Sequence, residues 1–327
     1  HSFQNNTERR SKRLKRLREL TEKMTKSVKS SQQGKLMGSQ TPSVRIVPEY
    51  DYTDGADAVR ILAVGKLVVD PWQSEVLNDW MGRTNEDIWS APTCGLSVPR
   101  QNGKTLDTSG RIASGMIMYS EWAIYTAHLQ KTATETFMEM KGLFESRGLR
   151  KYVKEIKAAL GREQIILKNG GRVVFVARTR NGGRGLHGDC LIFDEAQELT
   201  SEQQASFLPA ISASRNPQTI YLGTPPDENC TGTVFRKIRE RAKNGESSST
   251  AWTEYSVEEI GDVTDRNRWA DCNPALGRRM TETTIAAECE QMDEDTFARE
   301  RLGCGLQSIM IRTMPLIKPN GSNVHQR

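Results

Sequence analysis

The chain has 327 residues, of which 36% are hydrophobic, and it carries 46 Lys and Arg against 41 Asp and Glu. This length suffices for one large α/β domain, or for a domain of about 200 residues with appendages. Recurrent apolar segments exclude a wholly disordered protein, and no apolar run approaches the roughly 20 residues of a membrane-spanning helix. The first residues lack the apolar core of a secretory signal. We therefore expect a soluble protein that does not bind membranes.

The positive charge is concentrated in the first 35 residues, which hold 11 Lys and Arg and 3 Glu. Their core, residues 9–18, is either part of a solvated, disordered arm or a short helix that presents cations to nucleic-acid phosphates. Residues 27–41 are rich in Ser, Gln and Gly, which is typical of a linker. We assign residues 1–45 to a basic, disordered arm and linker, and expect folded structure to begin near Pro48.

Between residues 93 and 257, short apolar segments alternate with helical patterns, which indicates a mainly parallel sheet with helices on both faces. The expected strands are residues 94–98, 122–126, 190–193 and 219–222. The expected helices are residues 104–118, 131–145, 202–212 and 234–243. The sequence Asn169-Gly170-Gly171 predicts a hairpin between strands at 164–168 and 172–176. Beyond residue 257 we expect an irregular connector over 269–279 and one or two polar helices over 282–301.

A phosphate-binding loop is predicted at residues 98–105, between a strand and a helix. In such a loop, N–H groups at the helix N-terminus surround the phosphates, a Lys neutralises the β and γ oxygens, and a hydroxyl ligates Mg²⁺. Gly103, Lys104 and Thr105 supply this set, although Val98 replaces the first Gly of the usual GxxxxGK[ST] pattern. The other candidate nucleotide-binding residues of the loop are Arg100, Gln101 and Asn102.

Two carboxylates follow the apolar strand at 190–193. Phosphoryl transfer to water requires one carboxylate to hold Mg²⁺ and a second group to orient or deprotonate the attacking water. Asp194 suits the first role and Glu195 the second. The strand at 219–222 ends in Gly-Thr-Pro, and in a parallel sheet its carboxyl end would lie beside the other two. Thr224 is therefore a candidate sensor of the γ-phosphate, and the pattern predicts a nucleoside-triphosphate hydrolase.

Together these segments resemble the ATPase part of the large terminase subunit of tailed bacteriophages. The loop at 97–105 resembles that family's deviant Walker A motif, and Leu191–Glu195 with Ala196 and Gln197 resembles its Walker B strand and catalytic Glu. Residues 221–225 resemble its coupling motif. Asp70-Pro71-Trp72-Gln73 resembles its adenine-recognising motif. The likeness covers roughly residues 60–305.

The resemblance implies an α/β fold of the P-loop NTPase class, ASCE type, that hydrolyses ATP with Mg²⁺ to drive double-stranded DNA into the prohead. It implies a homo-oligomeric ring in the host cytoplasm, with the portal protein and the small terminase subunit as partners. It implies that Gln73 reads the adenine edge with its amide donor and acceptor. Arg100 would contact the γ-phosphate. Arg184 would act on the neighbouring subunit or touch DNA, with Arg178 and Arg180 as competitors for that role.

The sequence departs from the family near its C-terminus. Residues 297–303 resemble the segment that leads into the family's RNase H-like nuclease, and the residues that follow are too few for a fold of roughly 100–150 residues. We therefore expect no nuclease activity from this chain. The expected divisions are an ATPase domain over 46–260, a helical linker subdomain over 261–306 and an irregular tail over 307–327.

Two other functions stay open at this point. A helicase-like translocase is a different nucleic-acid-stimulated ATPase, but it usually needs a second motor lobe, and no strand–helix series able to form one follows residue 257. A truncated remnant that binds nucleotide without hydrolysing it is the other alternative.

Overall fold

The computed structural model describes residues 35–304, apart from residues 160, 162, 181, 226–229 and 231. The core of the basic arm, residues 9–18, and the irregular tail, residues 307–327, lie outside the described residues. No helix in the part of the chain that the structure describes is long and apolar enough to cross a membrane.

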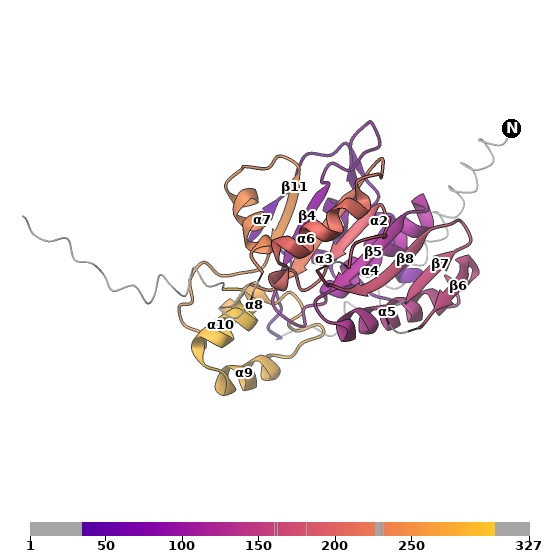
Figure 1. The fold of residues 1–327 in the computed structure, drawn as a ribbon. Coiled ribbons are helices and arrows are strands. Elements are labelled where there is room, and N and C mark those ends of the chain that lie inside the picture. Colours follow the sequence, from indigo (N-terminus) through magenta and orange to yellow (C-terminus); the bar gives the residue numbers. More distant parts are fainter. Residues whose placement is uncertain are drawn as a thin grey trace, which may run out of the picture.

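A nine-stranded sheet forms the centre of the fold, in the order β1-β11-β4-β10-β9-β5-β8-β7-β6 (Figure 1). From β11 to β8 every neighbouring pair is parallel, whereas β1, β7 and β6 are antiparallel additions at the two edges. The strands are β1 (Val44–Ile46), β4 (Thr93–Ser97), β5 (Trp122–Ala127), β6 (Val153–Lys157), β7 (Gln164–Leu167), β8 (Arg172–Ala177), β9 (Cys190–Phe193), β10 (Gln218–Gly223) and β11 (Thr250–Glu254). A separate two-stranded sheet pairs β2 (Tyr52–Thr53) with β3 (Gly82–Arg83).

Helices cover both faces of this sheet because its central strands are apolar on both sides. Along β9, Ile192 packs into the same apolar cluster as the first group of helices, while Leu191 and Phe193 pack with the second. The first group consists of α2 (Gly55–Val64), α3 (Pro71–Trp80), α4 (Lys104–Ser114) and α5 (Gln130–Glu145). The second consists of α6 (Ser201–Phe207) and α7 (Val234–Lys243).

Three C-terminal helices, α8 (Arg266–Cys272), α9 (Glu282–Gln291) and α10 (Glu294–Leu302), form a group beside the sheet (Figure 1). They have their own apolar core, in which the rings of Trp269 and Phe297 meet at 6.1 Å. Side-chain oxygens of Thr281 and Asp293 accept the backbone N–H groups of the first turns of α9 and α10. These caps define where the polar helices begin, although their hydrophobic periodicity is weak.

The parallel sheet, the four expected strands and the hairpin at residues 164–176 are confirmed. The expected start of the fold near Pro48 is wrong, because β1 pairs with β11 and the backbone N–H of Gly38 bonds to the carbonyl of Leu276. The prediction of an irregular connector over 269–279 is wrong for residues 269–272, which belong to α8. The helix expected over 104–118 ends at Ser114 and continues as a π-helical turn, Gly115–Tyr119.

A buried ion pair joins the end of α4 to the start of β5. The Arg111 guanidinium donates to both carboxylate oxygens of Glu121, at 2.6 and 3.2 Å, and to the side-chain oxygen of Gln218 at 2.7 Å. Arg111 is fully buried. Loss of one partner would leave the other charge in the apolar interior, which costs far more free energy than the intact pair contributes.

We expect Glu121→Ala to lower the free energy of unfolding by about 3–5 kcal/mol, the usual effect of breaking a buried pair. Urea unfolding followed by circular dichroism measures this change. The control Glu145→Ala removes an exposed carboxylate that lies 3.9 Å from Lys141, and it should change stability by less than about 1 kcal/mol. Equal effects of the two substitutions would contradict the prediction.

Candidate nucleotide-binding site

The carboxyl ends of three neighbouring parallel strands meet at one edge of the sheet. In the strand register, Ser97 of β4 lies opposite Gly223 of β10, and Tyr221 of β10 lies opposite Phe193 of β9. The loop after β4, Thr224 after β10 and the carboxylates after β9 therefore share this edge, where open α/β sheets bind ligands. The backbone N–H of Val98 also donates to the Gly223 carbonyl at 3.3 Å.

The loop over residues 98–103 ends in a left-handed turn that starts α4. Gly103 has φ +100° and Gln101 has φ +63°. A Cβ at Gly103 would also lie only 3.1 Å from the Arg279 guanidinium and 3.2 Å from the Gln73 amide nitrogen, so glycine fits both the dihedral angle and the space. The Leu106 N–H bonds back to the Gly103 carbonyl at 3.1 Å, whereas the N–H groups of Lys104 and Thr105 open the helix, and such a terminus is suited to an anion.

Lys104 and Thr105 occupy the first turn of α4. The Lys104 amine donates to the carbonyl of Val98 at 3.4 Å, so the side chain folds back over the loop. Burial lowers the pKa of Lys104, and the negative charge of Asp194 opposes this decrease. The ammonium group is therefore within the electrostatic reach of the carboxylate after β9, as expected of a Lys that neutralises phosphate beside a metal ligand.

Asp194 and Glu195 are each fixed by neighbouring groups of the chain. One oxygen of Asp194 accepts the Glu195 backbone N–H at 2.8 Å, and the other accepts the hydroxyl of the buried Tyr125. The Glu195 carboxylate accepts the backbone N–H of His128 at 3.2 Å and the hydroxyl of Thr132 at 3.4 Å. The two carboxylates therefore have separate partners and can perform separate tasks.

Arg178, one of the three candidates for an arginine that acts on a neighbouring subunit, is buried beneath these carboxylates. Its guanidinium donates to the backbone carbonyls of Asp194 and, at 2.9 Å, of Glu195. Burial lowers its pKa to about 10. In this position it supports the turn that carries both carboxylates, including the left-handed φ of +50° at Glu195. This role inside the subunit is a correction to the sequence-based alternative.

The other two arginines of that set lie on the surface. Arg180 is 84% exposed and pairs with Glu202 at 3.3 Å, and Arg184 is exposed in the segment between β8 and β9. Arg100 extends outward from the loop to a carboxylate oxygen of Glu300 at 2.8 Å. The nucleotide contact predicted for Arg100 would therefore require its side chain to leave Glu300.

Gln73 is fully buried and both ends of its amide are engaged. Its oxygen accepts the backbone N–H of Asp70 at 3.0 Å, and its nitrogen donates to the Gly103 carbonyl at 2.9 Å. In this geometry the Gln73 amide has hydrogen-bond partners within the protein at both its oxygen and its nitrogen, which does not favour a contact with the adenine edge. In the structure Gln73 joins the start of α3 to the phosphate-binding loop.

The C-terminal helical group fastens the loop from its other side through Asn102. The buried amide nitrogen of Asn102 donates to the Asn273 side-chain oxygen at 3.1 Å, and its oxygen accepts the Ala275 N–H at 3.0 Å. Arg301 of α10 donates to the Arg100 carbonyl at 2.8 Å and to the Gln101 side chain at 2.9 Å. The Asn102 side chain thus binds other parts of the protein, whereas the sequence predicted only that Asn102 belongs to the nucleotide-binding loop.

Sequence reasoning missed several residues that shape the site, namely Tyr125, Thr132, Asn273, Arg279 and Arg301. Arg279 bonds to the Asn102 carbonyl at 3.0 Å and pairs with Asp70 at 2.5 Å. The contacts from the C-terminal helical group to the loop, such as those of Arg279 and Arg301, span some 170–200 residues, and the polar character of residues 266–304 was their sequence signal.

The donor set fits nucleotide phosphates and a divalent cation. The left-handed Gly103 precedes α4, whose first turn carries Lys104 and Thr105. The charge of the Asp194 carboxylate acts on the Lys104 ammonium. Within the described ranges no group of three His, Cys, Asp or Glu side chains could hold a metal ion. A cation here would bind the Thr105 hydroxyl, Asp194 and phosphate oxygens, as Mg²⁺ does with substrate phosphates.

The described fold is similar to those of solved phage large terminases. The large terminase of bacteriophage HK97 matches with a TM-score of 0.66 and 18% identity, over 77% of this chain and 55% of its own. The large-terminase ATPase domain of Thermus phage P74-26 matches with a TM-score of 0.51 and 13% identity, over 73% and 95%. A large terminase from a thermophilic bacteriophage in complex with ADP matches with a TM-score of 0.51 and 11% identity, over 77% and 53%.

These matches establish the fold as that of the terminase ATPase domains, a P-loop NTPase fold with a mainly parallel sheet. β10 lies between the strand before the phosphate-binding loop and the strand before the carboxylates, which is the ASCE arrangement. The chain spans little more than half of the HK97 protein, at 55%, and almost all of the separate ATPase domain, at 95%. No family model and no curated protein sequence matches the chain.

We expect Asn102→Ala to loosen the contact between the loop and the C-terminal helices. The substitution removes a buried amide and leaves the Ala275 N–H without its acceptor, at a cost of about 1–3 kcal/mol for each buried group. Hydrogen exchange should then accelerate at Ala275 by about tenfold or more. The control Asn244→Ala, at an exposed amide bonded to Glu246 at 3.0 Å, should leave that exchange unchanged. Unaltered exchange in both variants would contradict the prediction.

A second prediction concerns the hydroxyl that orients Asp194. Tyr125→Phe should raise the Mg²⁺ concentration that supports half-maximal nucleotide binding by about tenfold, since loss of a group that orients a metal ligand weakens metal affinity. Titration of Mg²⁺ at fixed nucleotide measures the shift. Tyr221→Phe is the matched control, because its buried hydroxyl bonds to Gln204 at 2.8 Å and not to Asp194. An equal shift in both variants would show a general packing effect.

Proposed function

We propose that the chain is the ATP-hydrolysing motor of a phage large terminase, which powers the packaging of double-stranded DNA into the prohead. The observation that carries this proposal is the convergence of Lys104 and Thr105 with Asp194 and Glu195 at one sheet edge, in the fold of the terminase ATPase domains. The ATPase domain, expected over residues 46–260, would begin with β1 at Val44 because β1 belongs to the main sheet, and residues 261–306 would form the helical subdomain that leads out of it.

Each residue of the site has a distinct task in this proposal. The N–H groups that open α4 and the Lys104 ammonium bind and neutralise the phosphates. Thr105 and Asp194 would hold a Mg²⁺ ion, which when bound would supply further charge neutralisation at the phosphate oxygens. Glu195 orients the attacking water and accepts its proton as the bond to the γ-phosphorus forms and the bond to the leaving ADP oxygen breaks. Thr224, after β10, senses the γ-phosphate.

Two arginines are candidates for completing the site. Arg184 is exposed on the segment that precedes β9, where it can reach a neighbouring subunit of a homo-oligomeric ring or DNA. Arg100 would place its charge at the γ-phosphate after its side chain leaves the ion pair with Glu300. A fixed guanidinium at either position would stabilise charge that develops in the transition state. In this proposal the ring acts at the portal, and the portal protein and the small terminase subunit are its partners.

The test is ATP hydrolysis by the purified chain with and without duplex DNA and proheads. Lys104→Ala should abolish both nucleotide binding and turnover. Glu195→Gln should abolish turnover, by about a hundredfold or more for loss of a general base, but should retain ATP binding, since the amide keeps the shape of the carboxylate. Lys131→Ala, on the exposed start of α5, is the control and should behave like the parent chain.

The outcomes distinguish a packaging motor from a helicase-like translocase and from an inactive remnant. Turnover that DNA or proheads stimulate supports a packaging motor, whereas DNA stimulation without any prohead effect supports a helicase-like translocase. ATP binding without turnover in the parent chain, under all these conditions, supports the alternative of an inactive nucleotide-binding remnant. Full activity of Glu195→Gln would refute the assignment of the general base.

A further inference from the structure

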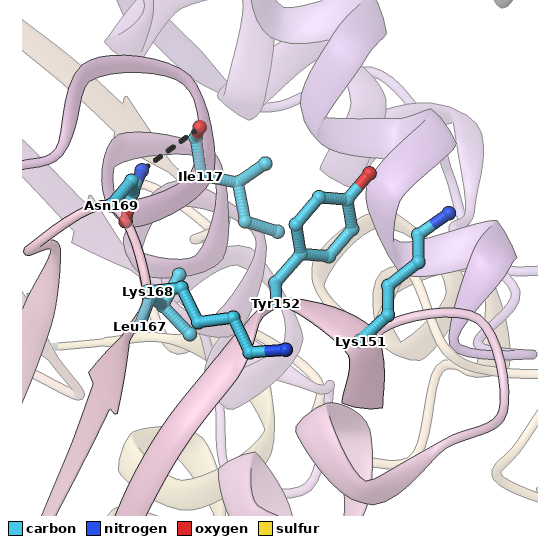
Figure 2. Close-up of a pocket in the computed structure, with 6 residues that line it drawn as sticks. All are labelled: Ile117, Lys151, Tyr152, Leu167, Lys168 and Asn169. Atoms are coloured by element: carbon cyan, nitrogen blue, oxygen red, sulfur yellow. Dashed lines mark hydrogen bonds between the residues drawn. The ribbon is translucent and has the colours of Figure 1, made fainter.

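A pocket of about 320 Å³ opens at the amino ends of the strands, whereas the nucleotide site lies at their carboxyl ends. It lies where α4 has ended and where the turn before β8 begins, so it is near the amino ends of β5 and β8. Figure 2 shows the Tyr152 ring between the side chains of Lys151 and Lys168. Asn169 closes one side, where its amide donates to the Met116 carbonyl at 2.8 Å. It also donates to the Ile117 carbonyl at 3.3 Å (Figure 2).

The surface around this pocket is strongly cationic. Among the described residues from 147 to 172, seven are Lys or Arg and two are Glu. Five of the cations are exposed and take part in no ion pair within the described part of the chain. These five, which we call the edge cations, are Arg147, Arg150, Lys151, Lys154 and Lys168.

The two carboxylates do not neutralise the edge cations. Glu163 is buried and turns toward α5, where it accepts the Thr134 hydroxyl at 2.8 Å. Glu155 lies 3.7 Å from the Lys157 ammonium and is compensated there. Arg172, a seventh cation, lies 3.4 Å above the Trp122 ring. The edge cations are therefore held together by the fold with their charge directed to solvent, an arrangement that raises their mutual repulsion unless an anion approaches.

The other basic element of the described surface, α7, differs in this respect. Two of its three arginines have carboxylate partners, since Arg236 lies 3.7 Å from Glu240 and Arg239 lies 2.6 Å from Glu254. Lys237 and Lys243 of α7 are exposed. α7 thus offers the same residue types without the same excess of uncompensated charge, and provides a matched reference surface on the same chain.

We infer that the edge cations and the pocket between Lys151 and Lys168 bind the phosphate backbone of duplex DNA. Several Lys and Arg spread over the 3-10 turn Arg150–Tyr152, β6 and the β7–β8 turn match a row of phosphates better than a single small anion. Lys, Arg, Asn and Tyr are also the side chains that contact DNA phosphates and sugars without reading bases. The inference rests on the proposed function for its ligand, but names a surface that the nucleotide chemistry does not use.

The test compares two double variants of the full chain for binding of a random-sequence duplex DNA at several salt concentrations. Lys151→Ala/Lys168→Ala should reduce the slope of log affinity against log salt by about 2, from roughly 0.9 for each lost phosphate contact. It should also weaken binding at 0.1 M salt by about tenfold. Lys237→Ala/Lys243→Ala removes the same charge from α7 and should leave the slope unchanged. Both variants keep the basic arm and all nucleotide-binding residues.

Thermal unfolding and ATP turnover without DNA serve as internal controls, and we expect both variants to match the parent chain in them. Equal slopes for the two variants, or a larger loss for the α7 variant, would overturn the inference while leaving the proposed motor intact. DNA binding that depends on Lys151 and Lys168 in a chain that never hydrolyses ATP would support the surface and refute the motor. Failure of the parent chain to bind duplex DNA at any salt concentration would refute both.

Discussion

The order of three parallel strands is the constraint on which the site depends. β10 lies between β4 and β9, and all three run in the same direction, with β4 ending opposite Gly223 of β10 and β9 ending opposite Tyr221. The loop before α4 lies about 90 residues before the two carboxylates after β9 and about 120 before the polar residue after β10, yet the parallel ladder brings all three to the same end of the sheet. Fully buried strands without a polar face are suited to this central place, because helices must cover both of their sides.

Strand pairing brings the loops together but does not fix their conformation. Contacts with the C-terminal helical group help to fix the conformation of the phosphate-binding loop. Asn102 is buried between the loop and Asn273, with its amide satisfied on both ends. Around it, charged groups bridge the same interface, including Arg279 with Asp70 and Arg100 with Glu300. The partly exposed ion pairs contribute little stability, whereas the buried amide would be costly to leave without partners. The loop conformation therefore depends on the helices staying attached.

Sequence patterns were sufficient for the features that are local or strongly apolar. The strand at Cys190–Phe193 and the hairpin around Gly170 carry their own signals, in burial on both faces and in turn chemistry. β1 and α8 were missed because a three-residue edge strand and a polar seven-residue helix have almost no periodicity to detect. The polar partners of the site were missed for a different reason. Tyr125 reads as an ordinary apolar strand residue, and Asn102 as a member of the nucleotide-binding loop, until the fold shows what lies beside them.

The nucleotide site lies at the carboxyl ends of the strands and the pocket beside the edge cations at the amino ends. Helix α4 runs between the two. The helix begins at Lys104, in the phosphate-binding loop, and the π-helical turn that continues it contains Ile117, which lines the pocket beside Lys168. The buried Arg111–Glu121 pair ties the far end of α4 to the start of β5. A rigid element that touches two sites is a physical basis for coupling only if both ligands bias its position. The Asn169 bonds to the carbonyls of Met116 and Ile117 provide a contact through which phosphate binding at the edge could bear on α4. If α4 connects the two sites, bound DNA should change nucleotide affinity in the parent chain and in the α7 variant. The Lys151→Ala/Lys168→Ala variant should lose this effect.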